Sequence, residues 1–373
     1  MGIYRDAWVE IDVKSLINNY LEIASSLGKG VKICPVLKAQ CYGMGAIQVA
    51  KILSPLGADM FAVATLDEAI EIRKEIPNKD ILVLGYVSKE YYSIALEYDI
   101  TLSMFNKGNI ISYNEICKSY KKTGKVHIKI NTGMNRIGFP VDDKTIEFIK
   151  ECFLMPYIQI TGIFSHFATA DEKEKERTIL QAKRMDTFLG KLKKQVILPV
   201  VHFSASAAIC NFPEYQYDMV RPGLSLTGHY ASEHVNKDRI KLTPCISIKA
   251  RLGSIIEVKK NEWIGYGFNK KLDKDTKIGL LPLGYSDGFT RLFSNNFYVV
   301  IRNKPCQIIG NICMDHSMID LSPVPDAKID DLIIVYGNGN DLSMTVQDVA
   351  DLRSTTVDEV LTNLSQRLPR KFV

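Results

Sequence analysis

A single lysine stands where an apolar run ends, in the segment PVLKAQCYGMG at residues 35–45. Lysine is among the residues least often buried unless it is paired. Lys38 therefore either extends its aliphatic stem toward solvent or is held inside the protein to do chemistry. A lysine amine that is kept out of water near other cations gives up its proton more easily, and it can then act as a base or a nucleophile.

Polar and small residues follow several other apolar runs. They form the segments NTGMNRIG at 131–138, SHF at 165–167, SASAA at 204–208 and VRPGLSLTG at 220–228. Ser206 could offer its hydroxyl and backbone N–H to an anion, and Gly223 and Leu224 could add backbone N–H groups. A held lysine together with a phosphate site is what pyridoxal phosphate requires, because the lysine forms a Schiff base with the aldehyde while the phosphate anchors the ring.

The elements that must position these residues are short apolar runs, most of them rich in Val, Ile and Phe. The eight runs are Lys32–Ala39, Phe61–Thr65, Ile81–Gly85, Ile100–Met104, Val126–Asn131, Ile158–Phe167, Val200–Ser204 and Met219–Thr227. Such runs are typical of fully buried parallel strands. Stretches with helical periodicity lie between them, one of which begins with a capping box formed by Thr65 and Glu68.

This alternation predicts an α/β fold of the (β/α)8 TIM type, whose chemistry lies at the carboxyl ends of the strands. The alternative is a doubly wound sheet, which usually has a glycine-rich phosphate loop after its first strand. The glycines after Lys38 do not have that spacing. Asp171 to Gln195 is expected to form one long charged helix.

The pattern changes after about residue 235. The segments CISIKARLGSIIEVK, KIGLLPLGY, FYVVIRNKPCQIIGNICMDHSMIDL and DLIIVYG alternate apolar and polar residues, with turn residues between them. This alternation predicts a second, mainly antiparallel β domain. We expect residues 1–12 to supply a strand to that domain, residues 13–235 to form the barrel and residues 236–373 to form the β-rich domain.

Composition and charge restrict the class of protein. The chain has 373 residues, 46% of them apolar and 24% charged, and a formal net charge of +5. Without a dense basic stripe interleaved with aromatic residues, nucleic acid is not an expected partner. The eight cysteines form no CxxC pair and no cluster with histidine at zinc spacing, so we expect reduced thiols and no metal site. No signal peptide and no apolar run of membrane-spanning length is present, which favours a cytoplasmic location.

Eight motifs taken together resemble the alanine racemase family of pyridoxal-phosphate-dependent alanine/serine racemases. In chain order they are VLKAQCYGMG, ATLDEAIEIR, NTGMNRIGF, SHFATAD, DMVRPGLSLTG, IGYGF, LPLGYSDGF and GNICMDHSMIDL. The resemblance covers almost the whole chain and implies a (β/α)8 barrel with a β-rich C-terminal domain. It also implies a homodimer with shared active sites, acting on a small amino acid and supplying D-amino acids for peptidoglycan precursors. Membrane-linked serine racemases carry a similar domain, so a longer natural chain could make this its cytoplasmic part.

The resemblance also implies roles for individual residues. Lys38 would hold the cofactor and act as one catalytic base, and Tyr266, supplied by the partner subunit, would act as the other. Arg136 and the backbone of Met314 would hold the substrate carboxylate. The remaining cofactor contacts would be Tyr42, Ser206, Gly223, Leu224 and Tyr285 at the phosphate, Arg221 at the pyridine nitrogen, and His166 beside Arg221.

Lys129 matches a lysine that is carbamylated in many members of the family. The chain departs from the family pattern at three places. Asn131 stands where an aspartate is common. Ala205-Ser206 replaces an Asn-Ser pair, which removes one polar contact. Asp358 stands where the family usually has tyrosine near the cofactor phosphate and the substrate pocket. A carboxylate there could bind a substrate hydroxyl, so we expect serine to be accepted alongside or in preference to alanine.

Three other functions remain open from the sequence. A barrel-type pyridoxal phosphate decarboxylase of basic amino acids shares the architecture, but it is not expected to carry GYGF and ICMDHSMIDL at these places. A non-catalytic pyridoxal-phosphate-binding barrel needs neither the second domain nor Tyr266. A phosphate-binding barrel enzyme without pyridoxal phosphate leaves Lys38 unexplained.

Overall fold

The computed structural model of the chain describes residues 4–373 and divides them into two compact units. The barrel unit comprises Ile17–Cys41 and Gly45–Leu242. The β-rich unit comprises Met1–Leu16, Tyr42–Met44 and Thr243–Val373, and residues 1–3 of the expected N-terminal segment lie outside the described part. The three residues Tyr42–Met44 therefore belong to the β-rich unit, although they follow Lys38 in the sequence by only a few positions.

Eight parallel strands form the sheet of the barrel unit, in the order β2-β9-β8-β7-β6-β5-β4-β3. Their bounds are β2 Lys32–Ile33, β3 Met60–Val63, β4 Asp80–Val83, β5 Thr101–Met104, β6 Gly124–Lys129, β7 Ile158–Phe164, β8 Val200–Ala205 and β9 Met219–Arg221. Each lies within or beside one of the eight predicted runs. A bridge between Val36 and Ala62 joins the two edges, with Leu37 N–H donating to the Ala62 carbonyl at 2.7 Å. The predicted barrel fold is confirmed.

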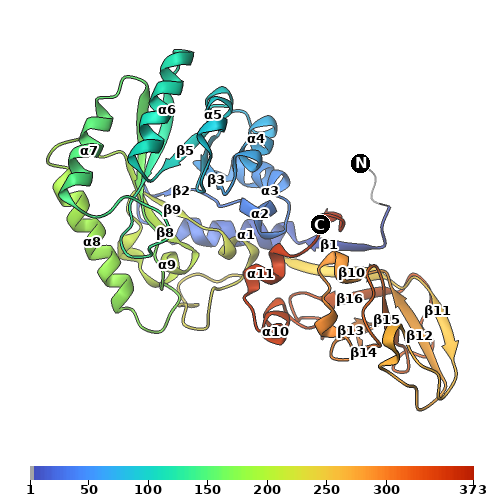
Figure 1. Ribbon diagram of the computed structural model, residues 1–373. Helices are drawn as coiled ribbons and strands as arrows, with labels where there is room; N and C mark the ends of the chain where they lie inside the picture. Colours follow the sequence, from blue (N-terminus) through green and yellow to red (C-terminus); the bar gives the residue numbers. More distant parts are fainter. Residues whose placement is uncertain (1–3) are drawn as a thin grey trace. The chain divides into compact units, whose positions relative to one another are not determined.

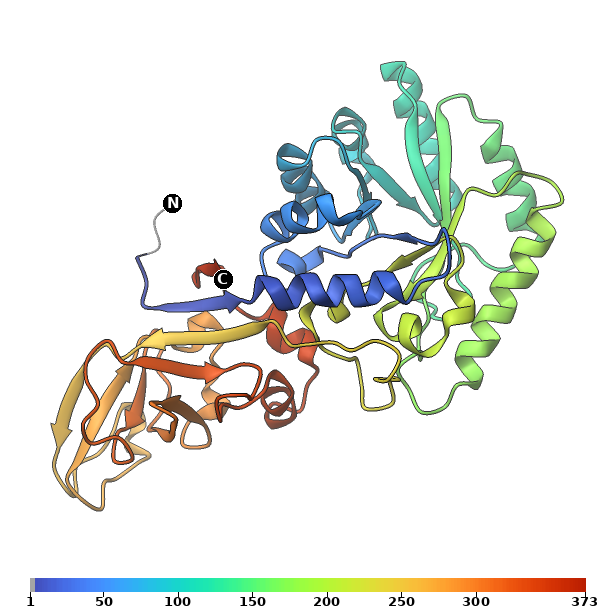
Figure 2. The ribbon, with the colours of Figure 1, turned by 180° about the vertical axis from the view of Figure 1, so that it is seen from behind.

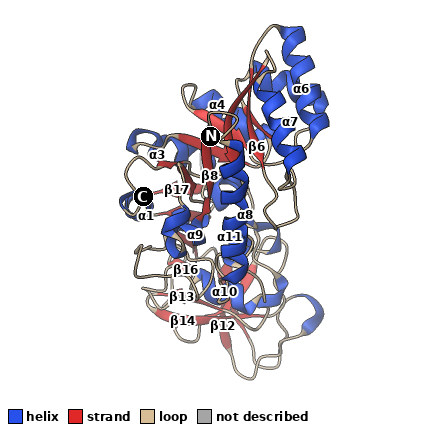
Figure 3. Cartoon of the chain, turned by 90° about the vertical axis from the view of Figure 1, so that its left-hand side faces the viewer, coloured by secondary structure: helices blue, strands red, loops and turns tan. Residues whose placement is uncertain are grey.

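Helices lie outside these strands, as Figures 1 and 2 show from opposite sides and Figure 3 shows for α6, α7 and α8. Their bounds are α1 Val13–Ser25, α3 Ala46–Leu53, α4 Leu66–Glu75, α5 Tyr92–Glu97, α6 Lys107–Tyr120, α7 Asp143–Phe153, α8 Glu176–Leu192 and α9 Ser206–Asn211. The predicted capping box of Thr65 and Glu68 is present at the start of α4. Helix α8 begins at Glu176, not at Asp171, because the preceding residues form a turn in which Glu172 N–H donates to the Thr169 carbonyl.

The β-rich unit is built on a nine-stranded sheet in the order β11-β12-β15-β14-β13-β16-β10-β1-β17. Its strands are β1 Ala7–Ile11, β10 Ile246–Arg251, β11 Ile255–Val258, β12 Thr276–Leu281, β13 Tyr298–Ile301, β14 Lys304–Ile309, β15 Ser317–Asp320, β16 Leu332–Tyr336 and β17 Arg370–Phe372. The pairs are antiparallel except for β1 with β17, so the predicted mainly antiparallel sheet is confirmed. Two helices, α10 Val346–Leu352 and α11 Val357–Thr362, follow the last long strand.

Two further features concern the described residues as a whole. None of their helices combines the length and the apolar character that a membrane crossing requires. The eight cysteines form no disulfide, and all except Cys313 are buried.

Candidate active site

Lys38 opens a single left-handed helical turn at the mouth of the barrel. The four residues after it have φ angles of +49°, +55°, +51° and +52°, although none of them is glycine; they are Ala39, Gln40, Cys41 and Tyr42. A left-handed helical conformation costs roughly 1–2 kcal/mol per residue other than glycine. The turn labelled α2, Lys38–Tyr42, is therefore held by its surroundings and not by local propensity.

Glu68 holds the start of this turn. One carboxylate oxygen accepts the N–H of Ala39 at 2.6 Å, and the other accepts the N–H groups of Ala64 at 2.8 Å and Thr65 at 3.1 Å. The same residue thus caps α4 and fixes the backbone directly after Lys38. The capping role was predictable from the spacing of Thr65 and Glu68, whereas the bond to Ala39 carries no local signal.

Arg221 ends strand β9 and is only 3% exposed. One terminal nitrogen donates to the carbonyls of Ser165 and Phe203 at 2.9 and 3.0 Å and lies 3.2 Å from Nδ1 of His166. The other lies 2.8 Å from Nδ1 of His202, a residue that the sequence analysis did not single out. Burial lowers the pKa of Arg221 to about 10, which still leaves the guanidinium charged near neutral pH.

The expected site residues of the barrel unit surround His166 with positive charge. Burial, followed by the charges of Arg221, Lys129, Arg136 and Lys38, lowers the pKa of His166 well below its usual value, so the imidazole is neutral. Every charge that acts on His166 in this way is a cation. The cations at this end of the barrel therefore disfavour protonation of His166 and favour the binding of an anion.

Lys129 is the most constrained of these cations. It is 4% exposed, and its amine lies 4.9 Å from the centre of the Phe164 ring. Across residues 4–373 its amine makes no hydrogen bond or ion pair. Burial and the charges of Arg221 and Arg136 lower the pKa of Lys129 well below its usual value.

Ser206 stabilises the turn after strand β9 through hydrogen bonds. Its hydroxyl oxygen accepts the N–H of Gly223 at 3.0 Å and the N–H of Ser225 at 3.2 Å. Ala205, which precedes it, pairs with Arg221 in the sheet. Within the described residues the N–H of Leu224 donates to no acceptor. Ser206, Gly223 and Leu224 are thus brought together, as the expected phosphate site requires.

Arg136 is exposed on a loop that the side chain of Asn131 organises. The amide oxygen of Asn131 accepts the N–H groups of Gly133 and Asn135 at 3.1 and 3.0 Å, and its amide nitrogen donates to the Asn135 side chain at 3.0 Å. An aspartate could accept the two N–H groups but could not donate to Asn135. The asparagine at this departure from the family pattern therefore adds a hydrogen bond to the loop that carries Arg136.

In the β-rich unit, the segments of Tyr285 and Met314 are held against each other. Tyr285 N–H donates to the Cys313 carbonyl at 3.1 Å, and Ser286 N–H donates to the Met314 carbonyl at 3.0 Å. Gly284 permits this approach, because a Cβ there would lie 2.3 Å from the Met314 oxygen. The N–H of Met314 donates to none of the residues that the structure describes, so it is available to an acceptor such as a carboxylate.

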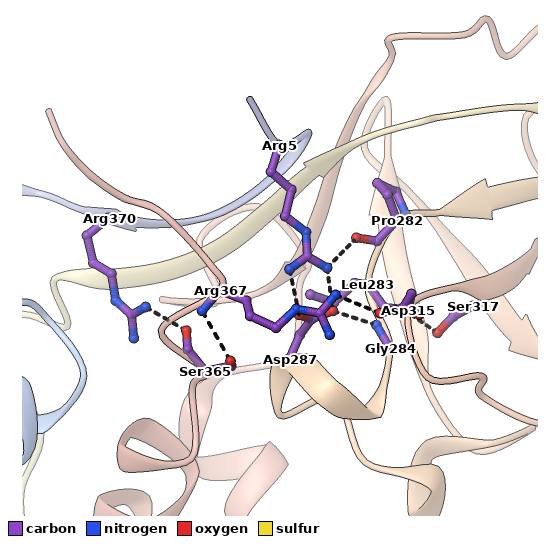
Figure 4. A network of polar contacts seen from close by, with 10 residues as sticks. All are labelled: Arg5, Pro282, Leu283, Gly284, Asp287, Asp315, Ser317, Ser365, Arg367 and Arg370. Carbon is purple, nitrogen blue, oxygen red and sulfur yellow. Dashed lines mark hydrogen bonds and ion pairs between the residues drawn. The ribbon is translucent and has the colours of Figure 1, made fainter. Parts of the chain in front are cut away.

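A partly buried ion pair braces this arrangement, as Figure 4 shows. Arg5 donates to both carboxylate oxygens of Asp287 at 2.6 Å, and the Asp287 side chain is 0% exposed. Asp287 also accepts the N–H of Gly284 at 3.0 Å, and Arg367 donates to Asp315 at 2.6 Å. Sequence reasoning missed these residues, although Asp287 belongs to the quoted LPLGYSDGF motif.

The other expected residues of the β-rich unit differ in exposure. Tyr266 is 74% exposed and lies between Gly265 and Gly267, whose φ angles are +67° and +73°. Tyr42 is buried, whereas Asp358 is exposed in the first turn of α11. The expected site residues therefore form two groups, one on each unit.

The barrel-unit group fits pyridoxal phosphate, the cofactor expected from the sequence. Nε of Arg221 donates to no residue in the described range, so it remains available to an acceptor such as a pyridine nitrogen. The positive charge around His166 suits a phosphate dianion, and Ser206 with the Leu224 N–H supplies polar contacts. Lys38 supplies the amine that an aldehyde requires.

Comparisons with known proteins agree with this reading. Residues 11–231 match the family described as "Alanine racemase, N-terminal domain", and residues 245–372 match "Alanine racemase, C-terminal domain". The alanine racemase of Clostridium tetani is 36% identical over 371 residues, covering 99% of this chain and 96% of that protein. "Alanine racemase 2" of Caldanaerobacter subterraneus subsp. tengcongensis is 38% identical over 370 residues, covering 99% of this chain and 95% of that protein.

Solved structures extend the likeness to three dimensions. The alanine racemase of Clostridium difficile 630 superposes with a TM-score of 0.96 at 36% identity, covering 100% of this chain and 97% of that one. The Bacillus anthracis alanine racemase with bound L-Ala-P superposes with a TM-score of 0.93 at 30% identity, covering 100% and 96%. The chain therefore belongs to the alanine racemase family of pyridoxal-phosphate-dependent amino-acid racemases.

Proposed function

We propose that this enzyme interconverts L- and D-alanine with two bases, Lys38 of one subunit and Tyr266 of its partner. When bound, pyridoxal phosphate holds the substrate amino group at its aldehyde carbon and withdraws electrons from the α-carbon. Lys38 then exchanges the α-proton on one face, and Tyr266 exchanges it on the other. Arg136 and the N–H of Met314 hold the substrate carboxylate, so that the substrate need not turn over between the two transfers.

The observation that best supports this proposal is the environment of Arg221. An arginine has N–H donors and no acceptor, and its pKa keeps it protonated near neutral pH. It can therefore donate to a ring nitrogen without giving that nitrogen a proton. The ring is then a weaker electron acceptor, which favours return of the α-proton over side reactions such as transamination. A decarboxylase would gain no advantage from a ring that accepts electrons more weakly.

Sharing of the active site between subunits is supported by the exposure of Tyr266. A catalytic tyrosine that is 74% exposed in its own chain needs a second surface to remove it from water. Lys38→Ala and Tyr266→Phe variants should each be inactive alone, while a mixture of the two should recover about a quarter of the wild-type rate. Half of random dimers are mixed, and each mixed dimer holds one intact site. A mixture that stays inactive would place Tyr266 with Lys38 of its own chain.

We further propose that Lys129 reacts with carbon dioxide. The neutral amine forms an N–C bond to the carbon of CO2 and releases one proton, which leaves a carbamate anion. The support is that this buried amine has no anionic partner among residues 4–373, whereas a carbamate would attract the positive charges of Arg221 and Arg136. Incubation with 13C-labelled CO2 should give one carbamate resonance by NMR that is absent from Lys129→Met. Identical spectra from the two proteins would contradict the carbamate.

Serine is the second candidate substrate, and Asp358 is the residue that favours it. A carboxylate where the family usually has tyrosine could accept a hydrogen bond from the substrate hydroxyl. The ratio of kcat/KM for L-serine to that for L-alanine should fall in Asp358→Tyr. An unchanged ratio would remove Asp358 from substrate selection and leave alanine as the substrate.

The role in the cell that we propose is the supply of D-alanine for peptidoglycan precursors. A bacterial strain that requires added D-alanine should grow without it when it expresses this enzyme, and should not grow when it expresses Lys38→Ala. Loss of optical rotation from L-alanine, without release of carbon dioxide, separates the racemase from a barrel-type decarboxylase. A protein that binds pyridoxal phosphate but does neither would be the non-catalytic alternative.

A further inference from the structure

Two buried histidines extend from Arg221 into the interior of the barrel. His202 on strand β8 lies between Arg221 and His127 on strand β6. Nδ1 of His202 is 2.8 Å from a terminal nitrogen of Arg221, and Nε2 of His202 is 2.8 Å from Nδ1 of His127. Both rings are buried. Arg221, His202 and His127 thus form one continuous chain of hydrogen bonds.

The arginine fixes the direction of this chain. Because a guanidinium only donates, Nδ1 of His202 must accept, and its proton lies on Nε2. Nε2 of His202 then donates to Nδ1 of His127, which leaves the proton of His127 on its own Nε2. Both rings are neutral: burial and the charge of Arg221 lower the pKa of His127 to about 3 and that of His202 well below its usual value. In both hydrogen bonds the donor therefore lies on the side of Arg221 and the acceptor lies on the side away from it.

The strands are shaped to hold these rings. Gly162 on β7 pairs with His127 in the sheet, and a Cβ at Gly162 would lie 2.5 Å from Nδ1 and Cε1 of the His127 ring. The pairing register between β6 and β7 shifts immediately before His127. On the other side, the Phe164 ring stacks on His202 with centres 4.8 Å apart and planes 3° apart. Space for His127 is thus provided by a glycine, and His202 is held flat by an aromatic ring.

The chain of hydrogen bonds ends at a pocket of about 290 Å³. The pocket lies at the amino ends of the strands, opposite to the end at which Lys38 and Arg221 lie, and it is lined by His127 with Asp80, Thr101, Lys125, Gln159 and Thr161. Nε2 of His127 donates to no residue in the described part of the chain. Its N–H is therefore directed to this polar space.

We propose that His127 is a positioning residue of the racemase: through His202 it fixes the orientation of the Arg221 guanidinium from the opposite end of the barrel. The inference rests on the proposed role of Arg221. It requires His202 to be a neutral Nε2–H tautomer, whose buried N–H donates to Nδ1 of His127. Loss of this acceptor would leave the N–H of His202 unpaired in the interior, so that the ring would turn to find another acceptor and would weaken one of the four contacts of Arg221.

The tautomers of His127 and His202 can be measured independently of catalytic activity. In 15N-histidine-labelled resting enzyme at neutral pH, Nδ1 of His127 and His202 should resonate as unprotonated nitrogens, and Nε2 of each as an N–H. Spectra of His127→Asn and His202→Asn assign the signals. A charged ring, or the opposite tautomer in either residue, would overturn the chain, whether or not the enzyme proves to be a racemase.

The kinetic arm compares two substitutions of His127. His127→Leu should lower kcat for racemisation about tenfold, as expected when a buried N–H loses its acceptor, with little change in KM. Because a displaced Arg221 would keep the ring nitrogen unprotonated less effectively, the ratio of transamination to racemisation should rise. His127→Asn can place an amide oxygen near the position of Nδ1. This variant should therefore restore most of kcat and most of the wild-type ratio of transamination to racemisation.

A matched control is available in His229, a buried histidine whose Nδ1 lies 3.0 Å from the hydroxyl of Thr227. His229→Leu loses a buried imidazole of the same kind without touching Arg221, so its transamination ratio should equal that of the wild type. If His127→Leu lowers both reactions in proportion, as His229→Leu would, or if His127→Asn fails to restore the ratio, His127 is merely structural and the proposal is wrong.

Discussion

The substitution Glu68→Gln should loosen the left-handed turn that begins at Lys38. The Glu68 carboxylate accepts three backbone N–H groups, one of them from Ala39 at 2.6 Å. A glutamine has only one acceptor oxygen. If that oxygen faces the N-terminus of α4, the amide NH2 faces the N–H of Ala39, and two donors then oppose each other.

The magnitude follows from these contacts. Loss of one charge-assisted hydrogen bond to an exposed backbone N–H costs about 1 kcal/mol. For a unit of this size that corresponds to a melting temperature lower by about 2–4 °C. The turn stores roughly 1–2 kcal/mol in each of its four left-handed residues, so it should relax when the bond is lost. We expect kcat to fall about tenfold and borohydride to attach less pyridoxal phosphate to Lys38.

Glu71 supplies the control for this prediction. It lies on the same helix and is exposed, and its side chain accepts a long hydrogen bond of 3.4 Å from the side chain of Gln40. Glu71→Gln makes the same chemical change without touching the turn backbone. Thermal melts, kcat and borohydride labelling should therefore separate the two variants. Equal behaviour of Glu68→Gln and Glu71→Gln would refute the inference that Glu68 holds the turn.

Three further predictions concern stability. Burial lowers the pKa of His229 to about 4, so between about pH 4 and pH 6.5 the unfolded chain binds more protons than the folded one. Stability should thus fall as the pH drops through this window, and thermal melts of His229→Gln should show a shallower fall; parallel curves would contradict the assignment. In Gly284→Ala the added Cβ meets the Met314 carbonyl at 2.3 Å, so the melting temperature should drop well below that of Gly253→Ala, whose added Cβ has its nearest neighbour 3.6 Å away. Arg5→Met and Asp287→Asn should be less than additive in urea unfolding, with a coupling energy of about 1–3 kcal/mol; zero coupling would mean that the ion pair does not brace this region.

The sequence predicted what depends on local pattern. Continuous apolar runs gave the eight barrel strands, alternation gave the antiparallel sheet, and the spacing of Thr65 and Glu68 gave the cap of α4. The start of α8 was placed too early, because the charged residues after Asp171 fit a helix as well as they fit the turn that they form. Helical periodicity alone does not distinguish these states near a helix end.

The features that sequence reasoning missed depend on residues far apart in the chain. Arg5 and Asp287 are 282 positions apart, and His127 and His202 are 75 positions apart, so no window along the chain contains either pair. The left-handed turn is missed for the same reason. Nothing in the residues Ala-Gln-Cys-Tyr favours positive φ, and the bond from Ala39 to Glu68 that holds it spans 29 positions.

The central claim, that two bases act on opposite faces of the substrate, is tested most directly by exchange of the α-proton in D2O. Wild-type enzyme should introduce deuterium into both enantiomers of alanine. Tyr266→Phe should retain exchange with the enantiomer whose α-proton faces Lys38 and lose it with the other. Equal loss of exchange from both enantiomers in this variant would contradict two separate bases and would leave Tyr266 with a role other than proton transfer.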